Sequence, residues 1–225
     1  MPFTRFGRWA THILKPVVAI LFISSALAVS GLGQEPPGLV TALWTAGAPS
    51  VWTNAPRWTS NPCAPNNGCG GNTYDVIISV SGVSLNTSPT VNSFTIGPGA
   101  LKTAGIVTLS VLGASTNKGS VTLNPRGALH SGTYTQAAIG TLAINISSPA
   151  LYGRVGVLGA ASVAGTLNVG LLGGFVPTIG QTFTILMAGT VTGSFTNNHI
   201  SINATEHFQV SYTATSVVLT VAAGP

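Results

Sequence analysis

The stretch GTLNVGLLGGFVPTIGQTFTIL, residues 165–186, decides the fold class. It contains no charged residue, and its apolar residues alternate with Thr and Gly. Gly and Pro interrupt it too often for a helix that spans a membrane, whereas alternating β-branched residues suit the pleated, half-buried surface of a strand. Pro177 cannot donate to a central ladder, so it belongs at a loop or an edge. The stretch therefore predicts short strands joined by turns, at Gly173 and Gly174 and at Pro177.

Similar short runs fill the chain from residue 74 to residue 222. Each is rich in β-branched residues and is bounded by Gly, Pro, Asn or Ser. They read YDVIISVSGVSL, NSFTIGPGAL, GIVTLSVL, GSVTLNPRGAL, GTLAINIS, GRVGVL, GTLNVGLL, TFTILMA and SVVLTV. Repeated runs of this kind are typical of strands, and no segment carries an apolar stripe at helical spacing. We expect an all-β domain with almost no helix over residues 74–222.

A loose phrase recurs among these runs. An apolar-x-apolar pair, a Gly turn, a small residue and another apolar residue follow one another from Phe94, Val121 and Val155, at intervals of 27 and 34 positions. Short strands joined by tight turns at such spacing predict a β-solenoid, in which stacked coils bury their inward residues on one another. A β-sandwich also has short strands at regular spacing and is the alternative fold.

Residues 1–33 have the features of a secretory signal peptide. A basic start without acidic residues precedes an apolar run over residues 17–29 and then small residues. Such a segment is removed from the mature protein, and the small-x-small rule fits cleavage after Ala28 or, as a second option, after Gly33. An uncleaved membrane anchor is disfavoured, because the run is shorter than the roughly 20 residues that span a bilayer. We expect a secreted or cell-surface protein, with the periplasm as a further destination.

Charged residues are scarce throughout the chain. Only 5% of the residues are charged, against roughly 25% in an ordinary soluble domain. Beyond the signal segment, five basic residues stand singly against three acidic ones, for a net charge of +2. A nucleic-acid-binding surface needs clustered Lys and Arg, so the composition disfavours that class of partner. Low charge also removes the usual protection of strand edges, which leaves self-association open.

Residues 34–73 are rich in Pro, Gly, Asn and Trp and show little periodicity. Within them, NPCAPNNGCGGN carries Cys63 and Cys69, the two cysteines of the chain. A close pair in a loop of an exported chain predicts a disulfide. Closing so short a loop contributes about 2 kcal/mol. A metal site would need more ligands, and a redox pair usually has the shorter C-x-x-C spacing.

Three tryptophans, Trp44, Trp52 and Trp58, lie in the same segment. Repeat proteins need a cap over the end of their stacked core, and large aromatic side chains suit that position. Aromatic rings also stack on sugars, because a ring offers a flat apolar face with a polar edge. We therefore predict a Trp-rich N-terminal cap, with a glycan-binding platform formed by these three residues as the alternative.

Groups that titrate are too few and too scattered for a recognisable active site. A glycosidase needs two carboxylates across the scissile bond, and Asp75 and Glu206 lie far apart in the sequence. His130, His199 and His207 lie in polar sequence that predicts exposed turns without metal-ligand spacing. No nucleophile elbow, phosphate-binding loop or calcium-binding repeat occurs. We expect no enzymatic activity, no cofactor and no metal.

Several segments resemble the secreted passengers of bacterial autotransporters. The opening of a passenger is similar to WTNAPRW (52–58), PNNGCGGNTYDVII (65–78) and VNSFTIGPGAL (91–101), and its end to YTQAAIGTLAINI (134–146), YGRVGVLGAASVAGTLNVGL (152–171) and GFVPTIGQTFTILMAGTVTGSF (174–195). The resemblance covers most of residues 50–222 and implies a right-handed parallel β-helix, exported and held at the surface. Autotransporters use a membrane β-barrel of many strands for self-translocation, and we do not expect this chain to translocate itself in that way.

These observations favour an exported, non-enzymatic β-solenoid that acts as a structural or adhesin-like protein at the cell surface or in the matrix. The alternative is a secreted polysaccharide-binding module that uses the three tryptophans. The expected partners are a cell-surface or matrix polysaccharide or further copies of the chain. We expect no nucleic acid as a partner, and no membrane span after signal cleavage.

Overall fold

The computed structural model describes residues 38–45, 47–80 and 82–224, and these residues form an all-β fold. Apart from strands, the described residues contain two short 3-10 turns, η1 (Ala55–Arg57) and η2 (Cys69–Gly71). The prediction of an all-β domain with almost no helix is confirmed. The predicted signal segment, with both cleavage positions, lies outside the described residues. No helix within the described ranges is long and apolar enough to cross a membrane.

The strands are short, and most of them alternate buried and more exposed side chains along their length. In chain order they are β1 (Leu39–Leu43), β2 (Ser50–Val51), β3 (Thr73–Ile78), β4 (Gly82–Leu85), β5 (Thr90–Val91), β6 (Ser93–Ile96), β7 (Ala100–Thr103), β8 (Thr108–Asn117), β9 (Ser120–Leu123), β10 (Ala128–Gln136), β11 (Thr141–Ile146), β12 (Arg154–Val157), β13 (Ala160–Val163), β14 (Thr166–Leu171), β15 (Thr182–Met187), β16 (Thr190–Gly193), β17 (His199–Ser201), β18 (Glu206–Tyr212) and β19 (Ser216–Ala223).

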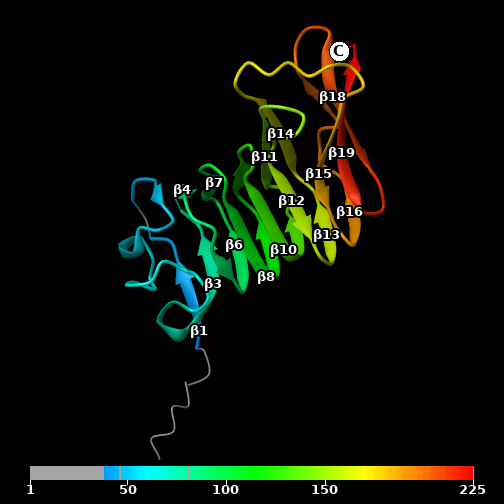
Figure 1. The fold of residues 1–225 in the computed structure, drawn as a ribbon. Coiled ribbons are helices and arrows are strands. Elements are labelled where there is room, and N and C mark those ends of the chain that lie inside the picture. Colours follow the sequence, from blue (N-terminus) through cyan, green and yellow to red (C-terminus); the bar gives the residue numbers. More distant parts are fainter. Residues whose placement is uncertain (1–37, 46, 81, 225) are drawn as a thin grey trace, which may run out of the picture. The chain divides into compact units, whose positions relative to one another are not determined.

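Parallel pairing dominates the two sheets that these described strands form (Figure 1). The 6-stranded sheet has the order β14–β11–β9–β7–β4–β2, and its pairs are all parallel. The 13-stranded sheet runs β1–β3–β6–β8–β10–β12–β15–β19–β18–β17, with β5, β13 and β16 beside this path. It is parallel as far as β15 and antiparallel from β15 through β19 and β18 to β17.

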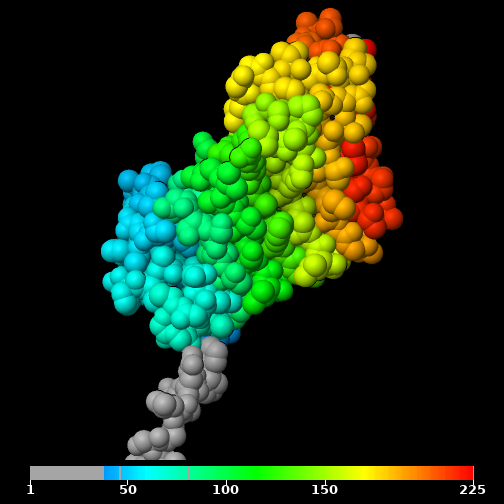
Figure 2. Space-filling view, in the orientation of Figure 1, coloured from blue at the N-terminus to red at the C-terminus, as the bar shows by residue number. Residues whose placement is uncertain are grey.

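The chain passes from one sheet to the other between successive parallel neighbours. For example, β7 of the smaller sheet lies in sequence between β6 and β8 of the larger sheet, which pair with each other. In the space-filling view the colours from blue through green to yellow accordingly succeed one another in chain order (Figure 2). Neighbouring parallel strands are therefore separated by about one passage of the chain, and not by a tight hairpin.

A line of glycines allows successive strands of the larger sheet to approach closely. A Cβ on Gly132 would lie 2.6 Å from the carbonyl oxygen of Leu112 and 2.7 Å from that of Gly113. A Cβ on Gly159 would lie 3.0 Å from the carbonyl oxygen of Gly132, and one on Gly189 would lie 2.9 Å from that of Leu158. Real Cβ atoms do not approach carbonyl oxygens to 2.6 Å, so a side chain at Gly132 would force the two strands apart.

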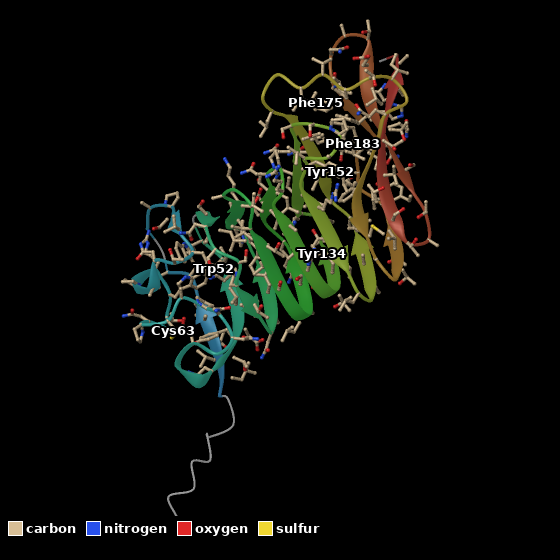
Figure 3. All side chains as sticks on the ribbon, in the orientation of Figure 1. Trp52, Cys63, Tyr134, Tyr152, Phe175 and Phe183 are labelled. Carbon is tan, nitrogen blue, oxygen red and sulfur yellow. A yellow bond between two sulfur atoms is a disulfide. The ribbon has the colours of Figure 1, made fainter. Side chains whose placement is uncertain are left out.

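Inward-facing side chains form one continuous core. Most are aliphatic or aromatic, but the middle strands also bury a polar network around Tyr134 and Gln136 (Tyr134 is labelled in Figure 3). The Tyr134 hydroxyl donates to Gln136 Oε1 at 2.8 Å, and Gln136 Nε2 donates to the carbonyls of Gly140 and Thr166 at 3.2 and 3.1 Å. Every buried side-chain nitrogen or oxygen of the described residues has a partner. The network is therefore compatible with a stable interior.

Side chains close the open edges at both ends of the parallel strands. Thr59 Oγ1 accepts a hydrogen bond from the backbone N–H of Leu43 at 2.9 Å, and the N–H of Thr59 donates to the carbonyl of Leu43 at 3.0 Å. At the edge of β14, Asn197 Oδ1 accepts from the N–H of Leu167 at 3.0 Å, while Asn197 Nδ2 donates to its carbonyl at 2.6 Å. Thr59 and Asn197 thus bond backbone N–H and C=O groups at the sheet edges, which would otherwise be free to pair with another strand.

Candidate functional site

The three tryptophans of the N-terminal segment pack together and are buried. Trp44, Trp52 and Trp58 are 3%, 0% and 1% exposed. The ring centroid of Trp58 lies 4.8 Å from that of Trp44 and 4.8 Å from that of Trp52. Trp58 Nε1 donates to the carbonyl of Trp52 at 2.8 Å. This arrangement agrees with a cap. It offers no ring face to a sugar, so glycan binding through these residues would require the cap to open.

The predicted disulfide between Cys63 and Cys69 is confirmed, with the two Cα atoms 6.0 Å apart. The loop that it closes is tied to its surroundings by two hydrogen bonds. Trp52 Nε1 donates to the carbonyl of Pro65 at 3.0 Å, and the Tyr74 hydroxyl donates to that of Cys69 at 2.8 Å (Trp52 and Cys63 are labelled in Figure 3). The disulfide therefore holds the loop that packs against the tryptophan cluster, which indicates a structural role for the bridge.

The structure keeps the two described carboxylates apart. Asp75 lies in β3 and accepts from Ser93 Oγ at 2.6 Å. Glu206 lies in β18 and accepts from Asn203 Nδ2 at 2.7 Å. Six strands, β6, β8, β10, β12, β15 and β19, separate β3 from β18 in the sheet order. The two groups therefore cannot act together across one scissile bond.

The expectation that His130, His199 and His207 lie in exposed turns is wrong about the turns, because all three lie in strands; His130 and His199 are exposed. His199 and His207 belong to the neighbouring strands β17 and β18, and their rings stack with centroids 4.6 Å apart. His207 is buried, because antiparallel pairing with β19 brings its Nδ1 within 2.8 Å of the carbonyl of Gly224. Groups of three or more His, Cys, Asp or Glu side chains that could hold a metal ion are absent from the described residues.

A different feature of the larger sheet, which we call the threonine face, stands out as a surface. It consists of outward-pointing residues of five strands, β6, β8, β10, β13 and β16. They are Ser93, Thr95, Ala114, Thr116, Thr133, Thr135, Ala160, Ser162, Thr190 and Thr192. Their neighbours along each strand point inward; Phe94, Tyr134 and Ala161, for instance, are buried. Alternation along the strands thus places an uncharged set of Thr, Ser and Ala side chains on this side.

Strand register aligns five of these residues into one straight row. Thr95 pairs with Thr116, Thr116 with Thr135, Thr135 with Ser162, and Ser162 with Thr192. Neighbouring hydroxyl-bearing side chains in the row are about 4.8 Å apart, because that is the spacing of paired strands. The second row lies two residues earlier on each strand, at about 6.6 Å along the strand direction. The threonine face is therefore a regular two-dimensional array.

The outward rows of the other strands lack this uniformity. On the smaller sheet, Lys102 of β7 stands opposite Thr122 of β9. On β8, β10, β12 and β15, the aligned row contains Ser110, His130, Gly156 and Met187. This row lines a shallow groove whose apolar residues Leu112, Leu158 and Met187 are exposed. Among these surfaces, the threonine face combines hydroxyl groups in register with the absence of charge.

Sequence reasoning missed the threonine face, although a signal for it exists. Three of the five strands of the face carry triplets with hydroxyl-bearing residues in the first and third positions, while β8 and β13 have Ala in the first position. The triplets are Ser93-Phe94-Thr95, Thr133-Tyr134-Thr135 and Thr190-Val191-Thr192. The triplets were hidden because their register across strands depends on unequal loops between them, which sequence spacing alone does not reveal.

Comparison with known proteins adds no relative. No protein-family model matches the chain, and no curated protein sequence matches it.

Proposed function

We propose that the parallel strands of the two sheets belong to a β-solenoid of the right-handed parallel β-helix type. Parallel pairing supports this proposal, because the sheets of a β-sandwich are built from antiparallel strands. The alternation of the chain between the two sheets supports it as well, since each passage then adds one strand to each sheet. The line of close approaches at Gly132, Gly159 and Gly189 is expected where successive coils turn in the same place.

We further propose that the protein is an exported, non-enzymatic, adhesin-like structural protein that attaches to a surface through the threonine face. The carrying observation is the face itself, a charge-free array in strand register whose side chains are half-buried on β6 and at Thr116 and exposed elsewhere. The signal-like N-terminus and the resemblance to autotransporter passengers support export and display. The separation of Asp75 from Glu206 supports a role without catalysis.

Retention on insoluble materials tests this function. The purified protein is passed over cellulose, chitin, peptidoglycan, silica and ice, and the bound fraction is measured for wild type and for Thr135→Lys. The substitution puts a charge in the centre of the threonine face. Thr182→Lys, at an exposed position of β15 outside the face, adds the same charge elsewhere. We expect retention on at least one material, lost in Thr135→Lys and kept in Thr182→Lys.

Failure of retention on every material would contradict attachment through this face. A separate observation would contradict the non-enzymatic part of the proposal. That observation would be cleavage of a glycan or a peptide by the purified protein, with the activity lost when Asp75 or Glu206 is replaced by its amide.

A further inference from the structure

We infer that the material recognised by the threonine face is ice. This inference rests on the proposed function, because it names the surface to which that face attaches. It follows from three properties of the face, namely its repeat, the chemistry of its side chains and the absence of groups that would recognise another solid.

The repeat of the face fits a lattice of water molecules. The row from Thr95 to Thr192 has five members in unbroken register. Its spacings of about 4.8 Å across the strands and about 6.6 Å along them come from the backbone and do not change from strand to strand. The spacing across the strands is close to an oxygen repeat on planes of hexagonal ice. A single hydroxyl gains nothing from such a match, whereas an array gains from it because many of its side chains can contact water molecules of the lattice at once.

Threonine side chains suit contact with an ordered layer of water. The hydroxyl both donates and accepts hydrogen bonds, while the methyl group excludes water and leaves the surrounding molecules to bond with one another. Branching at Cβ restricts χ1, so little side-chain freedom is lost when water orders around the group. Each such hydrogen bond adds only about 1 kcal/mol net, which is why a flat array of many equivalent groups is required.

The absence of charge on the face matters for the same reason. A Lys or Arg side chain holds a strong hydration shell of its own, which cannot join a crystal lattice. The residues of the threonine face carry no charge; the exposed Lys118 lies two residues beyond Thr116, and the other outward rows include Lys102 and, next to the His130 row, Arg154. Asp75 stands beyond the first strand of the face, and its carboxylate accepts from Ser93.

A crystalline polysaccharide fits the face less well. Surfaces that recognise such solids present aromatic rings on which sugars stack. The outward positions of the face are Thr, Ser and Ala, and the aromatic residues Phe94 and Tyr134 of the same strands point into the core. The face thus offers hydroxyls and methyls in register but no stacking platform.

Ice-affinity partitioning tests the inference. The purified protein is mixed with a fluorescent control protein that does not bind ice, a polycrystalline ice shell is grown slowly, and the fraction of each protein in the ice is measured. We expect wild-type protein and Thr182→Lys to enter the ice in excess of the control protein. We expect Thr135→Lys to be excluded like the control protein. Far-ultraviolet circular dichroism of each variant shows that it has kept its strands.

A second experiment distinguishes the contribution of the threonine hydroxyl groups from that of the methyl groups. Thr135→Ser with Thr116→Ser keeps the hydroxyls and removes two methyl groups, and we expect it to inhibit ice recrystallisation less than wild type does. Exclusion of the wild-type protein from ice overturns the inference. If cellulose, chitin, peptidoglycan or silica then retains wild type but not Thr135→Lys, the proposed attachment stands and only the choice of ice fails. If nothing retains wild type, both fail. A wild-type dimer that Thr135→Lys dissociates assigns the face to a second copy and also overturns the inference.

Discussion

Gly132 is the residue at which close backbone contacts most directly exclude a side chain. A Cβ there would meet the carbonyl oxygens of Leu112 and Gly113 at 2.6 and 2.7 Å, and both belong to backbone that cannot move without breaking its own ladder. We expect Gly132→Ala to lower the free energy of unfolding by roughly 1–3 kcal/mol, as overpacking against the backbone does. Urea unfolding followed by circular dichroism measures the change.

Gly82→Ala is the matched control for that substitution. A Cβ at Gly82 would lie 3.6 Å from the side chain of Pro49, which is ordinary van der Waals contact. We expect a change within about 0.5 kcal/mol, as for most surface positions. Equal destabilisation by the two substitutions would show that close approach at Gly132 does not control stability.

Tyr134 makes stability depend on alkaline pH. Burial raises the pKa of its hydroxyl above the usual value of 10.0. The folded state therefore favours the protonated form, and this contribution is fully present below pH 10 and is lost as the pH rises towards the folded-state pKa. Burial likewise raises the pKa of Tyr212, though that hydroxyl also accepts a hydrogen bond from the N–H of Phe195.

Tyr134→Phe tests this dependence. At neutral pH we expect the variant to be less stable by about 1 kcal/mol, because Gln136 loses a hydrogen bond from the hydroxyl. Above pH 10 the wild type should lose stability faster than the variant, so the difference between them should shrink. Urea titrations at pH 7, 9, 10 and 11 measure it. A constant difference over that range would show that Tyr134 does not ionise on unfolding.

At the scale of elements, Asn197 protects the edge of β14 by imitating a strand. Its carboxamide bonds both the N–H and the carbonyl of Leu167. Asn197→Ala would leave these groups open to another chain, and we expect the variant to self-associate. Sedimentation velocity over increasing concentration measures the change. Asn168→Ala, at an exposed position of the same strand, should stay like wild type; self-association in both variants, or in neither, would argue against a protective function of Asn197.

The disulfide loop is the second element with a measurable share of stability. Replacing both Cys63 and Cys69 by Ser removes the constraint on a short loop, for which we expect a loss of about 2 kcal/mol in the free energy of unfolding. Because Trp52 Nε1 bonds the carbonyl of Pro65 within that loop, tryptophan emission should also move to longer wavelength in the folded variant. An unchanged spectrum would mean that the cap holds without the bridge.

Sequence patterns predicted the strands and the disulfide well because both depend on local chemistry. Alternation of apolar and small polar residues defines β9 and β11, and cysteine spacing defines the bridge. The antiparallel end formed by β17, β18 and β19 was not predicted, since its strands have the same composition as the parallel ones. Whether Thr135 stands beside Thr116 depends on loops of unequal length, so the threonine face became visible only through the register.

At the scale of the whole described region, the proposed solenoid predicts that the stability of each coil depends mainly on the coils next to it. In such a fold each coil contacts only the next, so a weak coil in the middle separates the two ends energetically. In a β-sandwich, where two sheets share one core, the same weakness would lower the stability of every strand together. Gly132 lies in β10, midway along the parallel strands, and the three described tryptophans lie at the N-terminal end.

Two probes of one unfolding experiment distinguish these cases. In a full-length chain carrying Trp9→Phe, emission reports only Trp44, Trp52 and Trp58, whereas circular dichroism at the β-sheet band reports all strands. Without a further substitution, we expect the two urea midpoints to coincide. With Gly132→Ala added, the circular dichroism midpoint should fall and broaden while the tryptophan midpoint shifts less, because the N-terminal strands keep their own neighbours. Midpoints that fall together would instead indicate a single shared core and would contradict the solenoid.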